Sequence, residues 1–215
     1  SLCLALETVA GLRKGEQGAR ETSDRKPVGR RDVVLTMRRG RLPRVVRDMV
    51  RLHTLTGVRS QSLCQAKSEQ FDRSKVPWLW RPKHKTEYLA RELVVPIGPK
   101  ARRVLSRWID RAGPGEHLFR PESVRRDRRY GKRYTSNSYA NAIARGIRKA
   151  NLSGLDPQIE HWTPHQLRHA LGAKVREKYG VEAAQAMLGH DSLDATQIYT
   201  SRRLSDAVRI AEEIG

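Results

Sequence analysis

The sequence predicts an α+β domain that is mainly α-helical, with a small antiparallel β-sheet packed on a helical core. Apolar residues recur at helical spacing in several segments, most clearly in residues 43–55 and 136–150. Two short apolar runs, residues 76–80 and 93–97, flank a basic segment as the two strands of a hairpin would. With 215 residues the chain can form one good-sized core, or one domain and an appendage.

The charge balance indicates a polyanionic partner. The chain has 43 Lys and Arg against 23 Asp and Glu, which gives a formal net charge of +20 at pH 7. Such an excess is typical of proteins that bind nucleic acids. A ribosomal-type or simply basic soluble protein has the same composition, so charge alone leaves that alternative open.

The cysteines and the hydropathy exclude several classes of protein. Cys3 and Cys64 are far apart and form no C-x-x-C, so neither a disulfide framework nor a zinc finger is predicted. We expect reduced thiols and a cytoplasmic protein. No apolar run approaches the roughly 18 residues of a membrane span. Residues 1–6 are too short for a signal peptide and lack a basic leader. Because Ser1 stands where Met would, we expect a fragment or a trimmed chain.

The N-terminal segment divides into a helix end and a linker. Residues 1–13 place Leu2, Leu6, Val9 and Leu12 on one helical stripe, as the end of a helix would. Up to residue 31 the chain then turns polar and basic and contains several Gly and Pro residues, which is typical of a linker.

The next elements are a helix and a hairpin. Residues 43–55 predict an amphipathic helix that leads into the phrase Thr56-Gly57-Val58-Arg59. In isolation Arg59 would be a surface arginine after a helix. Between the two strands, residues 81–86 form a basic loop that contains Lys83 and Lys85. The tryptophans beside this loop are expected to pack the sheet.

A densely basic segment separates two further helices. Residues 99–112 and 136–150 each show an apolar face at helical spacing. Charge runs of the kind found at residues 120–134 are commonly solvated loops. In so basic a chain we expect contacts with the phosphates of a polyanionic partner, which carry no sequence information. The expected contacts are Arg125, Arg126, Arg128, Arg129, Lys132 and Arg133.

The stretch Thr163-Pro164-His165-Gln166-Leu167-Arg168-His169 predicts a helix start. Thr163 is a good N-cap, Pro164 suits the first helical position, and Gln166 stands where a capping box requires it. His165 and Arg168 are three positions apart and are expected to share a face that points away from the core. Free N–H groups and the helix dipole favour an anion at this end. The first turn therefore predicts a phosphate site.

Downstream of this helix the chain offers a histidine and a tyrosine. Residues 181–188 predict a short apolar helix that ends at Gly189, which suits a left-handed cap and puts His190 on a tight turn. Asp194 can cap a following short helix that contains Tyr199.

Three motifs follow one another in this part of the chain: H-x-x-R-H, then L-G-H, then a tyrosine nine residues past that last histidine. In this order they resemble the C-terminal signature of the tyrosine recombinases, or phage integrase family. The phrase T-G-x-R resembles the first arginine box of that family. The resemblance runs from about Lys26 onward and implies an integrase-like catalytic domain over residues 32–215. By the same resemblance, residues 1–20 are the C-terminal remnant of an N-terminal core-binding domain, and residues 21–31 are the linker.

The resemblance also implies the site residues. The implied catalytic residues are Arg59, Lys85, His165, Arg168, His190 and Tyr199. His169 is expected to support the site or the fold, and Lys83 is the fallback for Lys85. One departure is Ser62, since family members commonly have an acidic residue three positions after the first arginine.

These residue types fit metal-free phosphoryl transfer. A tyrosine hydroxyl has a pKa near 10 and attacks a phosphodiester poorly at neutral pH without help. The two arginines can donate to both non-bridging oxygens, which is work that Mg²⁺ does elsewhere. By resemblance, Lys85 protonates the departing 5′ oxygen, His165 assists the tyrosine, and His190 donates to the phosphate. The expected product is a 3′-phosphotyrosyl ester, formed without a cofactor or a metal.

The resemblance therefore implies a site-specific recombinase or integrase that acts on double-stranded DNA as a tetramer in a prokaryotic cytoplasm. In the family the C-terminal helix, here residues 204–214, often docks on a neighbouring protomer; folding back on its own core is the alternative. Two other functions stay open: a type IB topoisomerase-like enzyme, and a DNA-binding relic that has lost activity. A zinc hydrolase is disfavoured, because Gln166 replaces the base of H-E-x-x-H and Arg168 would repel a cation.

Overall fold

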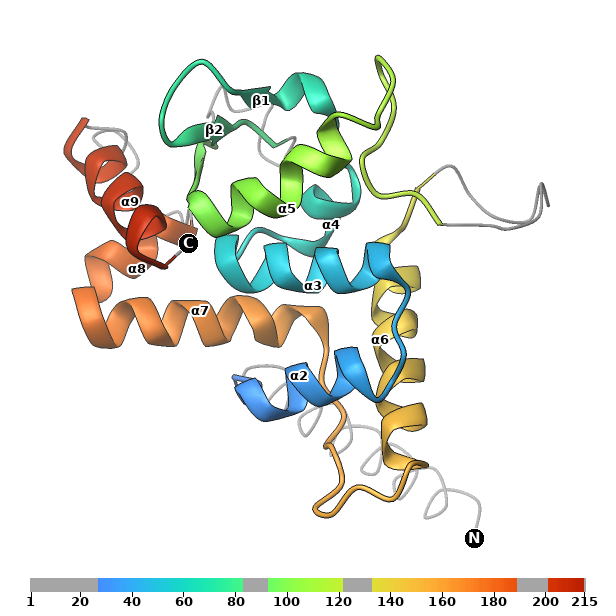
Figure 1. Cartoon of the computed structure of the whole chain (residues 1–215). Helices are drawn as coiled ribbons and strands as arrows, with labels where there is room; N and C mark the ends of the chain where they lie inside the picture. Colours follow the sequence, from blue (N-terminus) through green and yellow to red (C-terminus); the bar gives the residue numbers. More distant parts are fainter. Residues whose placement is uncertain (1–26, 83–92, 122–132, 189–200, 215) are drawn as a thin grey trace, which may run out of the picture.

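The computed structural model describes residues 27–82, 93–121, 133–188 and 201–214. The described part is mostly helical and contains one small antiparallel sheet, which confirms the predicted fold class (Figure 1). None of the helices in these ranges is long and apolar enough to cross a membrane.

The helices mostly follow the predicted segments. Their bounds are α2 (Arg30–Arg38), α3 (Arg44–Thr56), α4 (Ser60–Cys64), α5 (Pro99–Ile109), α6 (Ser136–Asn151), α7 (Pro164–Tyr179), α8 (Val181–Leu188) and α9 (Ser201–Ile214), with a 3-10 turn η1 (Ser68–Gln70). Helix α2 was not predicted, and it begins inside the segment expected to be linker. The helix has a short apolar face that contains the buried Val33, but the arginines at both of its ends make this apolar period hard to recognise in the sequence. Helix α4 was also not predicted, because one helical turn is too short to show a period.

The sheet has the strand order β1-β2-β3. Strands β2 (Trp78–Trp80) and β3 (Val95–Ile97) pair antiparallel, with Trp78 opposite Ile97 and Trp80 opposite Val95, as the hairpin pattern predicts. Strand β1 (Phe71–Asp72) was not predicted, since two residues form no pattern. The ring of Trp80 stacks on that of Phe71 at a centroid distance of 5.1 Å. This tryptophan therefore packs the sheet, as expected.

Helix α3 occupies the centre of the main core. It lies between α5 and α7 in Figure 1 and contacts both, together with α6, α9 and β3. Val45, Val46, Met49 and Val50 on α3 are all fully buried. The burial of each such side chain stabilises the folded state by about 1.5–3 kcal/mol. These contacts anchor α3, the helix that directly precedes the turn with Arg59 in the chain.

Helix α9 folds back on its own chain. Ile210 and Ala211 pack with Leu171 and Val175 of α7 in a second apolar cluster. At the surface, Lys178 forms an ion pair of 2.8 Å with Glu213. In this single chain the apolar face of the last helix is covered by α7, α8 and β3, which is the folded-back arrangement; docking on a neighbouring protomer stays a prediction.

Candidate active site

The first turn of α7 has the predicted cap. The backbone N–H of Thr163 donates to Oε1 of Gln166 at 2.7 Å, and the N–H of Gln166 donates to the carbonyl oxygen of Thr163 at 3.1 Å. Pro164 stands at the first helical position, where no N–H is needed. The capping box therefore fixes where the helix starts, and with it the positions of the residues of the H-x-x-R-H box.

Arg168 lies in the protein interior, with 5% of its surface exposed. Its Nη1 donates to the carbonyl oxygen of Gly57 at 2.5 Å, and its Nη2 donates to that of Leu188 at 2.7 Å. One guanidinium thus joins α7 to the end of α3 and to the end of α8. Leu188 is the first residue of the L-G-H motif, so this bond fixes the position of the residue that precedes Gly189 and His190 in the chain.

Gly57 is the residue that lets the end of α3 meet Arg168. It closes the helix in the left-handed region, at φ 60°, and its N–H donates to the carbonyl oxygen of His53 at 2.8 Å. A Cβ at this position would lie 2.7 Å from a methyl of Leu188 and 2.8 Å from one of Leu171. Glycine is therefore required by both the backbone angle and the space. Two residues later, Arg59 is the N-cap residue of α4, and it is exposed.

The two arginines come together although they are far apart in the sequence. Burial, followed by the positive charge of Arg59, lowers the pKa of Arg168 to about 10. Within the described ranges, neither guanidinium forms an ion pair with a carboxylate. Two nearby like charges repel unless an anion lies between them, so the arrangement favours a phosphate.

The two histidines of α7 lie at the edge of this site. His165 is exposed and His169 is half-buried, and their ring centroids are 4.5 Å apart at an interplanar angle of 84°. We expected His165 and Arg168 to share an outward face. The structure differs, because the Arg168 side chain turns inward to reach two backbone carbonyls while His165 stays at the surface.

His53 is a site neighbour that the sequence reasoning missed. It is completely buried on α3, and its ring stacks on that of Tyr139 at a centroid distance of 6.1 Å. Burial, followed by the positive charges of Arg168 and His165, lowers the pKa of His53 to about 3. Its imidazole is therefore neutral at physiological pH. The available signal was a histidine inside an apolar helical stripe, one turn before Gly57.

Several predicted site residues lie outside the described ranges. They are Lys83, Lys85, Arg125, Arg126, Arg128, Arg129, Lys132, His190 and Tyr199. Arg133 is described, and its Nη1 donates to the carbonyl oxygen of the next residue, Tyr134, at 3.2 Å. Ser62, where an acidic residue was expected, is buried on α4. The structure thus brings together Arg59, His165, Arg168 and His169, and the roles of the other residues stay predictions.

A family comparison agrees with this geometry. The model of the family described as "Phage integrase family" matches residues 34–205. The chain belongs to the phage integrase family. The match includes every predicted catalytic residue, from Arg59 to Tyr199.

Named relatives cover part of this integrase-family chain. A tyrosine recombinase XerC of Actinobacillus pleuropneumoniae serotype 7 is 34% identical over 113 residues, which is 51% of this chain and 33% of the relative. A tyrosine recombinase XerD of Listeria monocytogenes serotype 4b is 33% identical over 115 residues, which is 51% of this chain and 36% of the relative. The matched region therefore spans about a third of the length of these relatives.

Solved structures share the fold. An integrase from mycobacterium phage Brujita superposes with a TM-score of 0.62 at 19% identity and covers 88% of this chain and 58% of its own. XerA recombinase gives a TM-score of 0.57 at 20% identity and covers 84% of this chain and 63% of its own. A lambda integrase dimer bound to a COC' core site gives 0.57 at 18% identity, over 82% of this chain and 60% of its own.

Proposed function

We propose that this chain cuts and rejoins double-stranded DNA as the catalytic part of a site-specific tyrosine recombinase. The observation that supports this most is the hydrogen bond from Arg168 to the carbonyl oxygen of Gly57, two residues before Arg59, whose positive charge lowers the pKa of Arg168. Family membership and the names of the relatives, tyrosine recombinases XerC and XerD, support the same activity.

The proposed phosphate ligands are the two arginines. A guanidinium has five N–H donors, and the bonds to Gly57 and Leu188 use only part of the Arg168 set. The remaining donors, with those of the exposed Arg59, would bind the non-bridging oxygens of a phosphodiester. Because Arg168 is held by two carbonyls before DNA arrives, little reorganisation is needed as charge develops in the transition state.

The proposed chemical step balances without an external reactant. The hydroxyl oxygen of Tyr199 attacks phosphorus, the bond from phosphorus to the 5′ oxygen breaks, and His165 assists removal of the tyrosine proton. Lys85 gives a proton to the leaving 5′ oxygen, and His190 donates a hydrogen bond to the phosphate. The 3′-phosphotyrosyl ester keeps the bond energy, so attack by another 5′ hydroxyl reverses the step.

DNA and further copies of the chain are the proposed partners. The basic segment with Arg125, Arg126, Arg128, Arg129, Lys132 and Arg133 would contact phosphates along the duplex, at a net charge of +20. A lambda integrase tetramer bound to a Holliday junction shares the fold at a TM-score of 0.57. We propose a tetramer on DNA by analogy with it, in the cytoplasm of a prokaryotic cell. Residues 1–20 are proposed as the end of a core-binding domain, and residues 21–31, which include the first two residues of α2, as the linker.

Covalent selection from random DNA separates this function from its alternatives. The chain is incubated in EDTA with duplexes that carry a randomised segment, denatured in SDS, and the protein-linked DNA is sequenced. A common enriched sequence is expected of a site-specific recombinase. Adducts without sequence enrichment would instead assign a type IB topoisomerase-like activity. Retained DNA binding with no adduct would identify a binding relic.

A further inference from the structure

A groove separate from the arginine site runs between α2 and α7, on the surface of α3. Its volume is about 500 Å³. Helix α2 lines it with Val33, Val34 and Met37, and α7 lines it with Leu167, Ala170 and Leu171. These positions repeat at the spacing of one helical face. Val33, Leu167 and Leu171 are themselves buried, and Val34, Met37 and Ala170 are the partly exposed members that a ligand can contact. Figure 1 shows α2 and α7 both below α3. The proposed catalytic arginines do not line the groove.

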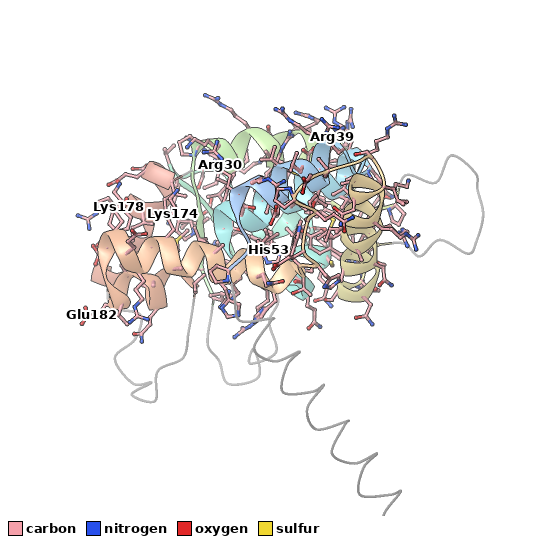
Figure 2. All side chains as sticks on the ribbon, turned by 90° about the horizontal axis from the view of Figure 1, so that it is seen from below. Arg30, Arg39, His53, Lys174, Lys178 and Glu182 are labelled. Atoms are coloured by element: carbon pink, nitrogen blue, oxygen red, sulfur yellow. The ribbon has the colours of Figure 1, made fainter. Side chains whose placement is uncertain are left out.

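The rim of this groove is basic. Arg30 from α2, Arg51 from α3, Lys174 from α7 and Lys100 from α5 all line it and are all exposed. Figure 2 labels Arg30 and Lys174 on their two helices. No Asp or Glu is among the described residues that line the groove. Arg51 already forms an ion pair with Asp48, with 3.0 Å between Nη1 of Arg51 and Oδ1 of Asp48. The positive charge that the rim offers to a ligand therefore comes from Arg30, Lys100 and Lys174.

An apolar floor with a basic rim fits one kind of ligand best. A nucleic-acid backbone would gain from the rim, but it has no apolar face to bury on the floor. An amphipathic helix buries aliphatic side chains spaced at i, i+3 or i+4 and i+7, and its flanking carboxylates reach the rim. The last helix of this chain does not fill the groove, because its apolar face is already covered by α7, α8 and β3. Among the residues of this helix whose side chains are described, Ile214 alone reaches the lining.

We propose that the groove between α2, α3 and α7 binds an acidic amphipathic helix of a protein partner. The aliphatic side chains of that helix lie between the two apolar stripes. Its carboxylates pair with Arg30 on one side and Lys174 on the other. The groove is thus a protein-docking surface in addition to the DNA-facing site.

A designed peptide tests the proposal on the full chain. The probe is a fluorescein-labelled helical peptide of about four turns, with Leu at i, i+3, i+4 and i+7 and Glu on both flanks. Fluorescence anisotropy is expected to show saturable binding, and the same peptide with Lys in place of Glu is expected not to bind. In the double variant Arg30→Glu/Lys174→Glu the affinity should fall by about tenfold or more, which is about 1.4 kcal/mol.

Matched variants make the result specific. Arg148→Glu/Lys149→Glu changes the same charge at exposed positions on α6, outside the groove, and should leave peptide affinity unchanged. Ala170→Trp fills the groove without changing charge and should weaken binding. Circular dichroism checks that each variant is folded, and the charge variants at exposed positions keep the test valid if Ala170→Trp does not fold.

Three results would overturn the proposal. One is the absence of saturable peptide binding, or an equal loss in both double variants. Another is self-association in sedimentation that only Arg30→Glu/Lys174→Glu abolishes, which would make a second copy the occupant. The third is displacement of the peptide by a short DNA duplex, with DNA binding lost only in that same variant, which would assign the groove to nucleic acid.

Discussion

The guanidinium of Arg168 donates a hydrogen bond of 2.5 Å to the carbonyl oxygen of Gly57, a residue 111 positions earlier in the chain. This bond ties the helix that carries the H-x-x-R-H box to the turn that carries Arg59. Its partner bond to Leu188 ties in the end of α8. Arg168 therefore holds the ends of α3 and α8 against α7, in addition to its proposed role as a phosphate ligand. The structural role can be measured as a change in stability, separately from activity.

Replacing Arg168 with lysine should destabilise the fold. An ammonium cannot span both carbonyls as the planar guanidinium does, so at least one buried carbonyl loses its donor. We expect a loss of roughly 1–3 kcal/mol in the free energy of unfolding, measured by urea titration. Arg176→Lys is the control on the same helix, because Arg176 is exposed. Equal stability of Arg168→Lys and the wild type would show that the two hydrogen bonds of Arg168 do not stabilise the fold.

Gly57→Ala should be more damaging than an ordinary glycine substitution. The position has φ 60°, and the new methyl would meet Leu188 and Leu171 at under 3 Å. Gly154→Ala is the matched control, since Gly154 also has a positive φ, 77°, but has no atom within 4 Å of the added carbon. We expect about 1 kcal/mol of destabilisation for Gly154→Ala and clearly more for Gly57→Ala in thermal unfolding. The same loss in both variants would argue against the close approach.

The buried His53 should make stability fall in acid. Burial lowers its pKa in the folded protein to about 3, whereas the unfolded chain takes up the proton near the ordinary value of 6.5. The unfolded state therefore binds more protons between these values. The contribution of neutral His53 is fully present above pH 6.5 and is lost as the pH falls towards 3, by up to about 1.4 kcal/mol per pH unit. His53→Leu should remove this slope in urea unfolding from pH 7 to pH 5. An unchanged slope would contradict the burial of a neutral imidazole.

DNA binding should weaken steeply with salt. Neutralising a phosphate releases counterions, so the logarithm of the binding constant falls by about 0.9 per phosphate contact for each decade of salt. If Arg125 and Arg126 contact phosphates, the double alanine variant should reduce that slope by about 2. A double variant of Arg102 and Arg103 on α5 provides the control, because it removes the same charge outside the proposed contact segment. A salt-independent affinity would count against a phosphate-based interface.

The sequence predicted most of the helices because their apolar stripes are long and regular. Residues 43–55 and 136–150 show the period over three or more turns, and the structure has α3 and α6 there. The cap at Thr163 was also predictable, since a capping box is local chemistry. Helix α4 and strand β1 were not predicted, because a single turn or a pair of residues contains no period.

The site was predictable only in part, for a different physical reason. The motifs place Arg59 and Arg168 in one constellation, but they do not give the direction in which each side chain points. That Arg168 turns inward depends on two carbonyls which come from the ends of other helices. His53 was missed because its role follows from tertiary burial against Tyr139 and from the nearby charge of Arg168, and its local sequence shows only a polar residue in an apolar stripe.

Covalent capture tests the proposed activity most directly. Wild type and Tyr199→Phe are incubated with labelled duplex DNA in EDTA and denatured in SDS. Protein-linked DNA is then resolved, and the attached peptide is identified by mass spectrometry. We predict a metal-independent adduct at Tyr199 in the wild type and none in the variant, with DNA binding equal in the two. An adduct that persists in Tyr199→Phe, or DNA binding by the wild type with no adduct at all, would contradict a phosphotyrosyl recombinase.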